Sequence, residues 1–524
     1  ESDRNSSLRG NIHLKNLMDR NRFVVNADVK ELSTNYDHLV NLLPDLLGKR
    51  IPKELERVGY FSSRGKVRVS KSNLDIQLRT IAEMGLSQVD LKLKDIDKGQ
   101  KASYSGSIEL EDFKLGKFVN DPNIGLFSIK GEVEGQGFSI DEISINVKGE
   151  LSKHQYKGYT YSNIDINGVL RDKQFNGYLA VNDPNIKLTF QGLAYLSDVY
   201  KFNFTADVDY ADFMTLNLFT RDEKSILKGK IDMNLTGSTL DNIEGVISFK
   251  DASYSNQNDD YYFTDFTITS ENKDNFRELK VNSTDIINGY LRGNFKYRQL
   301  KALSMNSLGS LFVNYEKEVV DEGQFLEFNF NIYSKIIDVF VPDLQLGPNS
   351  VIKGRVDSDE DIFQLTVKSP SVEAYEFVID DINLQVDNKN PLFNTLLTIN
   401  EIDSEYYNLS EINLVDVVLN DTLYIRGDMI GGKEKTEHYN FSVYHTINEK
   451  NQAVVGMKTS ELFFKGKSWL INPENNNQNK VVYDKEISTY AIDNFNLINE
   501  NQQIQLAGLI NSDEDKNIDL RLNN

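Results

Sequence analysis

The sequence predicts an all-β protein, built as one long, curled antiparallel sheet (a repeating β-groove) with two short helical islands. Apolar and polar residues alternate through most of the 524 residues, which is the period of a strand with one apolar and one solvated face. Short polar turns such as residues 182–185 join consecutive runs, so neighbouring strands are expected to pair antiparallel. About 30 such runs follow one another, and helical periodicity interrupts them only twice.

The chain begins with groove strands over residues 1–35, and the first helical island follows over residues 36–60. Pro52 suits the first turn of a second short helix in this island, and Gly59 suits its end. The first helix is predicted by leucines that recur at helical spacing, which are Leu39, Leu42, Leu43, Leu46 and Leu47.

Residues 61–296 return to groove repeats, and residues 297–316 form the second helical island, where Gly309 weakens the helix by about 1 kcal/mol. Groove repeats resume over residues 317–524 and are expected to continue beyond the chain end, because the last run stops in mid-pattern. The Asn-rich residues 472–479 are expected to form an exposed loop.

One set of apolar residues shares the parity that faces away from water, and we expect it to line the groove. The clearest example is the segment 161–192, where three alternating runs follow one another. The candidate lining residues are Ile164, Ile166, Leu170, Phe175, Leu179, Val181, Ile186, Leu188, Phe190, Ile231, Met233, Leu235, Phe249, Phe328 and Phe330.

Composition excludes several classes of partner and site. The net charge of −21 argues against nucleic acid, which requires clustered basic residues, and against adhesion to anionic lipid head groups. The absence of Cys excludes disulfides and thiolate metal sites. No apolar run is long enough to span a membrane, and no signal peptide opens the chain. We interpret the sequence as a segment of a longer protein.

No motif for catalysis, cofactor binding or metal binding is present, so we expect no enzyme activity and no cofactor. The five His residues match no zinc motif. Asp357, Asp359 and Asp361 resemble the start of a calcium loop, but Ile362 replaces the required Gly and Lys368 the required Glu, so a hairpin turn is favoured. A single Trp also disfavours a polysaccharide-processing enzyme.

A one-sided sheet must hide its apolar face, and its cover decides the function. An open twisted sheet rarely exceeds ~10 strands, so about 30 strands require separate sandwiches, a solenoid or one sheet curled into a gutter. Facing sheets indicate a cell-surface array of β-sandwiches with adhesive or structural duty. An uncovered face indicates a trough for acyl chains, which gain about 0.8 kcal/mol per buried CH₂.

The segment 226–295 resembles the central region of the TamB family as it occurs in Bacteroidota-type bacteria. The matching patterns are residues 227–237 (LKGKIDMNLTG), residues 240–245 (LDNIEG), Phe249, Tyr254 and residues 289–295 (GYLRGNF). The tail from Trp469 to Gly508 is similar too.

TamB proteins are AsmA-like, bridge-like lipid transfer proteins. The resemblance implies a groove that crosses the periplasm and carries phospholipids between the inner and outer membranes. It also implies support for outer-membrane protein assembly with an Omp85-family partner similar to TamA. The full-length protein would be anchored in the inner membrane by a segment absent here. The partners expected are therefore phospholipid acyl chains and, through other parts of the protein, the Omp85-family protein.

Overall fold

The described residues form 34 strands of a single antiparallel sheet with a few short helices, which confirms the predicted fold class. The computed structural model describes residues 6–16, 19, 21–42, 53–137, 142–195, 200–273, 275–310, 316–334, 336–341, 344–375, 377–511 and 516–523. The chain divides into two compact units: residues 1–239 with 243–265, and residues 240–242 with 266–524.

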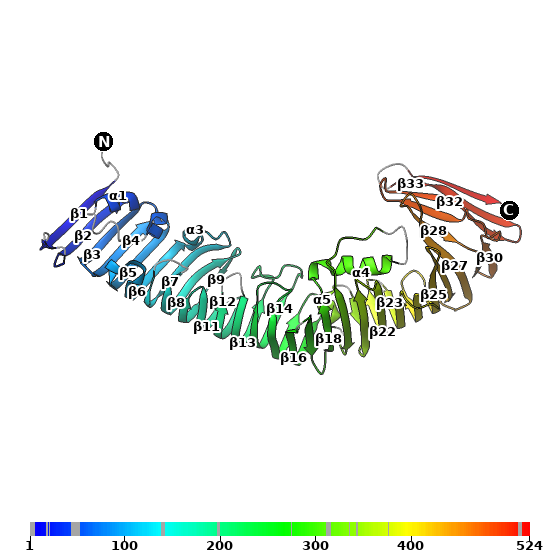
Figure 1. Ribbon diagram of the computed structural model, residues 1–524, viewed down its shortest axis with the longest axis horizontal. Coiled ribbons are helices and arrows are strands. Elements are labelled where there is room, and N and C mark those ends of the chain that lie inside the picture. Colours follow the sequence, from blue (N-terminus) through cyan, green and yellow to red (C-terminus); the bar gives the residue numbers. More distant parts are fainter. Residues whose placement is uncertain are drawn as a thin grey trace. The chain divides into compact units, whose positions relative to one another are not determined.

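Unit 1 is a single layer of strands, seen side by side in Figure 1. Its strands are β1 (Ser7–Lys15), β2 (Val24–Thr34), β3 (Phe61–Ser70), β4 (Asn73–Ala82), β5 (Gly85–Lys94), β6 (Ser103–Lys114), β7 (Ile124–Gln136), β8 (Ser144–Tyr156), β9 (Tyr159–Tyr161), β10 (Ile164–Arg171), β11 (Gln174–Asp183), β12 (Ile186–Tyr195), β13 (Tyr200–Asp212), β14 (Ile226–Gly237) and β15 (Glu244–Ser255). Strand β16 (Asp260–Lys273) spans the boundary between the units.

Unit 2 contains the remaining strands: β17 (Phe276–Asn282), β18 (Ile287–Asn294), β19 (Phe325–Ile332), β20 (Leu344–Leu346), β21 (Ser350–Asp357), β22 (Ile362–Ala374), β23 (Phe377–Asp387), β24 (Thr395–Asp403), β25 (Leu409–Leu419), β26 (Thr422–Gly431), β27 (Glu437–Ile447), β28 (Ala453–Met457), β29 (Ser460–Phe464), β30 (Lys467–Ile471), β31 (Lys480–Asp484), β32 (Thr489–Asn499), β33 (Gln502–Asn511) and β34 (Asn517–Asn523).

Both helical islands are present, although each is shorter than expected among the described residues. The first contains helix α1 (Tyr36–Leu42) and the 3₁₀ helix η1 (Lys53–Val58), while Leu43, Leu46 and Leu47 lie outside the described residues. The second contains η3 (Tyr297–Gln299) and α4 (Leu300–Gly309), and residues 311–315 lie outside the described part. Three short elements were not predicted: η2 (Ile96–Lys101), α3 (Leu115–Val119) and α5 (Ile337–Phe340).

Bulges bend many of the long strands and so curl each unit's sheet. The register shifts between Leu110 and Phe113 in β6 and between Val208 and Ala211 in β13. Asp112, inside the β6 bulge, has a φ of 48°, a left-handed backbone that Asp tolerates better than most residues. A bulge adds a residue to one strand only, so the strand bends and its local twist increases.

Near the C-terminal end of unit 2, pairs of short strands replace single long ones. One half of β27 pairs with β28, and the other half pairs with β29. Strands β28 and β29 lead to β31 and β30, and both of these pair with β32.

The Asn-rich loop expected to be exposed is exposed only in its middle. Asn472 and Asn479 are buried, and the Asn472 side chain donates to the carbonyl oxygens of Met457 (2.7 Å) and Asn476 (2.8 Å).

Candidate functional site

Four rows of apolar residues cross unit 1 at right angles to the strands, and together we call them the apolar face. Each row consists of residues in direct register on neighbouring strands. All members of the three longest rows are apolar except the glycines and Tyr104. At roughly 4.8 Å per strand, a row from β2 to β15 runs on the order of 60 Å. The row through Ile166 consists of Val29, Gly65, Leu78, Val89, Ile108, Gly131, Gly149, Ile166, Leu179, Phe190, Ala206, Ile231 and Phe249.

The other rows place the remaining candidates of unit 1 on the same face. Ile164, Val181 and Leu188 are in register with one another, and Met233 is in register with Phe204. A further row contains Val25, Val69, Leu74, Leu93, Tyr104, Gly135, Ile145, Leu170, Phe175, Ala194, Phe202, Leu235 and Gly245.

No second sheet faces this surface in the described part of unit 1. Ile164 and Ile186 are each 8% exposed, but the residues that bury Ile164 come from neighbouring strands of the same sheet, such as Leu151 and Val181. The other predicted lining residues of unit 1 are half-buried. They pack edge to edge with their neighbours while their outer surfaces stay open.

Glycines let aromatic rings lie flat on the middle of the apolar face. Gly168, Gly177 and Gly192 are in direct register on β10, β11 and β12. Phe175 packs against Phe190 with ring centroids 6.4 Å apart, and Phe190 packs against Phe204 at 4.8 Å. The glycines remove the side chains that would lift these rings, so the surface is smooth and strongly apolar.

A turn after β13, which the alternation of residues does not predict, covers one margin of the apolar face. Leu216 is fully buried in this turn and packs with Ile186, Val208 and Ala211. The segment that carries it includes Phe213, Met214 and Leu218, and this run of apolar residues was the available signal.

Asp183 ends β11 at the same margin and is 1% exposed. Its carboxylate accepts hydrogen bonds from the Tyr159 hydroxyl, from the Ser162 hydroxyl (2.8 Å) and backbone N–H (3.0 Å), and from the Asn185 N–H (2.9 Å). Burial raises the pKa of Asp183, but these hydrogen bonds outweigh it and leave the pKa below its usual value. The carboxylate therefore ties the strand ends together in its charged form.

Three other polar side chains lie among apolar ones in unit 1. Burial raises the pKa of Tyr104 to about 12, and burial with smaller repulsive contributions raises that of Tyr161 to about 12. Burial lowers the pKa of His154, whose ring stands edge-on to Phe127 at 5.8 Å. All three stay neutral at pH 7, so they add no charge to this surface.

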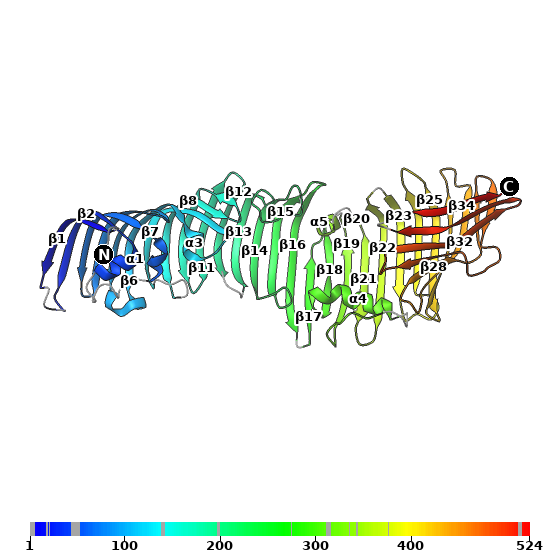
Figure 2. The same ribbon diagram turned by 90° about the horizontal axis from the view of Figure 1, so that it is seen from above.

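In unit 2, Phe328 and Phe330 lie on an apolar face of the same design, but helix α4 covers part of it. Leu303 of α4 is 1% exposed and packs with Phe295, Leu326 and Val356, with Phe328 at the edge of the cluster. Figures 1 and 2 both place α4 against the sheet between β18 and β22, and it contacts β21 and β22. This helix therefore shields the face around Phe328 in part.

A buried carboxylate interrupts the apolar face of unit 2. Asp416 is in register with Thr395 and Ile425, in the row that begins with Leu279, Leu291 and Phe328. It is 7% exposed, and its Oδ1 has no hydrogen-bond partner in the described structure. Burial raises its pKa, which hydrogen bonds from Thr395 only partly offset. Sequence alternation placed Asp416 on the apolar parity, which was the signal that could have identified it.

An all-β protein with one long antiparallel sheet, whose apolar face is half-buried and has no second sheet over it in the described part of unit 1, is the class that the fold and this surface define. Comparison with known proteins found no match: no protein-family model, no curated protein and no solved structure matches the chain. The resemblance to the TamB family therefore stays a prediction. Among the described residues, no helix is long and apolar enough to cross a membrane, and no group of three or more His, Asp or Glu could hold a metal ion.

Proposed function

We propose that the apolar face of unit 1 carries the acyl chains of phospholipids, as part of a non-enzymatic bridge between two membranes. The observation that supports this most directly is the unbroken register of apolar residues and glycines from β2 to β15, with no second sheet facing it among the described residues. A large exposed apolar surface on a protein in water normally marks a binding site.

The energetics favour lipid tails as the occupant. Burying apolar area gains about 25 cal/mol per Å², or about 0.8 kcal/mol for each CH₂ group. Neighbouring positions along a row are chemically alike, so a bound chain meets a similar environment from strand to strand. Such a surface retains an acyl chain while presenting no single deep site that would stop its movement along the row.

The opposite face supports the same proposal. Residues that alternate with the apolar rows, such as Asp165, Lys187 and Thr189, are exposed and polar. These polar side chains keep this face in contact with water. Acyl chains are therefore expected to bind to the apolar face only. The alternative, an array of adhesive β-sandwiches, requires facing sheets, and the described residues of unit 1 form a single layer.

The cellular setting is proposed from the resemblance to the TamB family alone. In this setting the chain would lie in the periplasm, within a longer protein anchored in the inner membrane. The resemblance adds an Omp85-family partner at the outer membrane and a contribution to outer-membrane protein assembly. The inner and outer membranes would be the donor and acceptor of the phospholipid.

The test is native mass spectrometry of the purified chain, with lipids identified after extraction. The expected result is co-purified phospholipid that decreases strongly in Leu188→Asp and Phe190→Arg, because a buried charge has no partner on this face. Thr189→Asp, on the polar face of the same strand, is the matched control and should retain lipid. The same substitutions in the full-length protein should interrupt phospholipid transport. Transport at the wild-type level in Leu188→Asp would refute the conduit.

A further inference from the structure

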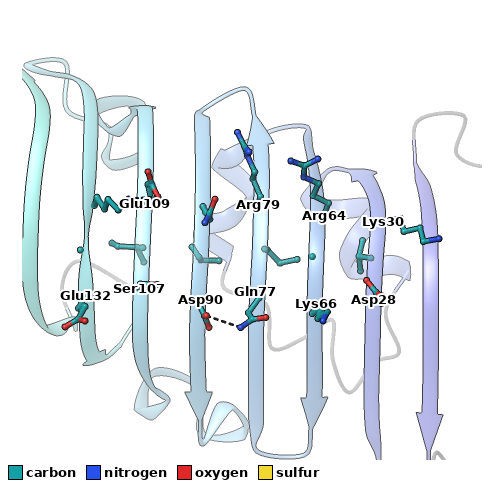
Figure 3. Close-up of a pocket in the computed structure, with 18 residues that line it drawn as sticks. Asp28, Lys30, Arg64, Lys66, Gln77, Arg79, Asp90, Ser107, Glu109 and Glu132 are labelled. Carbon is teal, nitrogen blue, oxygen red and sulfur yellow. Dashed lines mark hydrogen bonds and ion pairs between the residues drawn. The ribbon is translucent and has the colours of Figure 1, made fainter.

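The polar face of unit 1 contains a hollow of about 930 Å³ across β2 to β7 (Figure 3). Two ridges of polar side chains form its walls. Its floor is backbone, because the side chains of the row between the ridges point to the opposite, apolar face. The lining residues are Asp28, Val29, Lys30, Arg64, Gly65, Lys66, Gln77, Leu78, Arg79, Gln88, Val89, Asp90, Ser107, Ile108, Glu109, Lys130, Gly131 and Glu132.

Cations gather at one end of the hollow. Arg64 and Arg79 are directly opposite each other on β3 and β4, in the first ridge. Lys66 stands in the second ridge, directly opposite Asp28 on β2, and Lys30 lies beside the first ridge on β2. All four side chains are exposed. Strands β3 to β5 carry six Lys and Arg against two Asp and Glu, in a chain whose net charge is −21.

These cations make no ion pair with a carboxylate among the described residues, whereas some other basic groups of the polar face do. Lys130 pairs with Glu109 at 3.6 Å, and Arg9 pairs with Glu31 at 3.0 Å. Arg64 and Arg79 make no ion pair within the described structure, although like charges directly opposite on a sheet repel each other. The nearby carboxylate of Asp90 instead accepts a hydrogen bond from Gln77 (3.0 Å).

We propose that this hollow binds a ligand through a phosphate group, which the guanidinium groups of Arg64 and Arg79 bracket and Lys66 contacts from the other ridge. Guanidinium matches phosphate geometry through paired N–H donors. One anion between two arginines converts their repulsion into attraction. The same reasoning disfavours a neutral ligand, which would leave both charges unbalanced.

The rest of the hollow sets the class of ligand. Its volume lies within the range of about 300–1,000 Å³ that is typical of small-molecule sites and exceeds what a phosphate ion needs. The far end presents polar and acidic side chains, including Gln88, Ser107 and Glu132. These groups accept or donate hydrogen bonds to hydroxyl groups and repel a second anion. A phosphate monoester or diester on a hydroxyl-rich body fits this arrangement. The site lies on the face opposite the proposed lipid path, so it does not depend on that proposal.

The first test is calorimetric titration of the whole chain with inorganic phosphate, with glucose 1-phosphate and with vesicles that contain phosphatidylglycerol. Glucose 1-phosphate should bind saturably, with about tenfold or greater weakening in Arg64→Gln or Arg79→Gln. The matched control is Lys187→Gln on the polar face of β12, which should bind normally. If the two soluble phosphates bind and the vesicles do not, the ligand is a soluble phosphate. If only the vesicles bind, the phosphate is that of a lipid head group.

A second measurement separates binding from damage to the fold. Glucose 1-phosphate should raise the Tm of the native chain, because a ligand that binds only the folded state stabilises it. It should not raise the Tm of Arg64→Gln. Without ligand, Arg64→Gln should melt at the same or a higher temperature, because the repulsion with Arg79 is gone. Absence of saturable binding to all three probes, or equal weakening in Lys187→Gln, would overturn the site.

Discussion

The ring of Phe175 occupies the space that a side chain at Gly168 would need. A Cβ atom added to Gly168 would lie 2.7 Å from Cε2 of Phe175 and 2.8 Å from the carbonyl oxygen of Asn176. The backbone of Gly168 has an ordinary φ, so close contact and not conformation selects glycine here. This contact keeps the apolar face smooth at its centre.

Gly168→Ala should therefore destabilise the protein by about 1–3 kcal/mol, because the methyl group displaces a packed ring. Chemical denaturation measures the change. Adding Phe175→Ala should remove the part of this penalty that comes from the ring, so the two substitutions should be non-additive. Additive effects would show that the ring and the glycine do not compete for space.

Asp183→Asn should destabilise the folded state by about 2–4 kcal/mol at pH 7, because an amide nitrogen replaces an acceptor of several buried hydrogen bonds. The pKa of Asp183 is lowered from 3.8. Its contribution is therefore full above that value and lost as the pH falls through the folded-state pKa. Urea denaturation from pH 7 to pH 3 should show this loss in the native chain and not in Asp183→Asn. Asp165→Asn, on the exposed face of β10, should change little.

Asp416 should show the opposite dependence on pH. Its pKa is raised from 3.8, so it favours folding when protonated and its cost increases as the pH rises through the folded-state pKa. Asp416→Asn keeps a hydrogen-bonding side chain without the charge, and it should raise the Tm at pH 7 but not at pH 3. Thermal unfolding at both pH values measures this, with the exposed Asp380→Asn as control. An equal Tm change at both pH values would contradict the role of charge.

Leu303→Ala should cost about 2–4 kcal/mol, because it opens a cavity between α4 and the sheet beneath. Met305→Ala, on the same helix but 44% exposed, should cost far less. Hydrogen exchange of the α4 amides should accelerate in Leu303→Ala, since this leucine anchors the helix. Unchanged exchange would mean that other contacts, such as the hydrogen bond from Asn388 Nδ2 to the Ser307 carbonyl (2.8 Å), hold α4 in place.

Sequence reasoning identified the local features of the molecule because they follow from local stereochemistry. The alternation of Ile164, Asp165, Ile166 and Asn167 sets which face each side chain occupies, whatever the neighbouring strand is. Turn residues and leucine spacing likewise located the hairpins and the described parts of both helical islands. The fold class followed from the repetition of these local signals.

Only the tertiary structure decided what the apolar residues meet. The pairing of Gly168 with Gly177, the burial of Leu216 over Val208 and the cover that Leu303 provides all join segments separated in sequence. Alternation predicts a face but not its register, and a one-residue slip would send every side chain to the other side. By itself the sequence determined a sheet with one apolar face. Long-range contacts decided that the rows align and that α4 shields one part of unit 2. They also decided that the apolar face of unit 1 stays open beyond the margin that Leu216 covers. No local sequence pattern encodes these contacts.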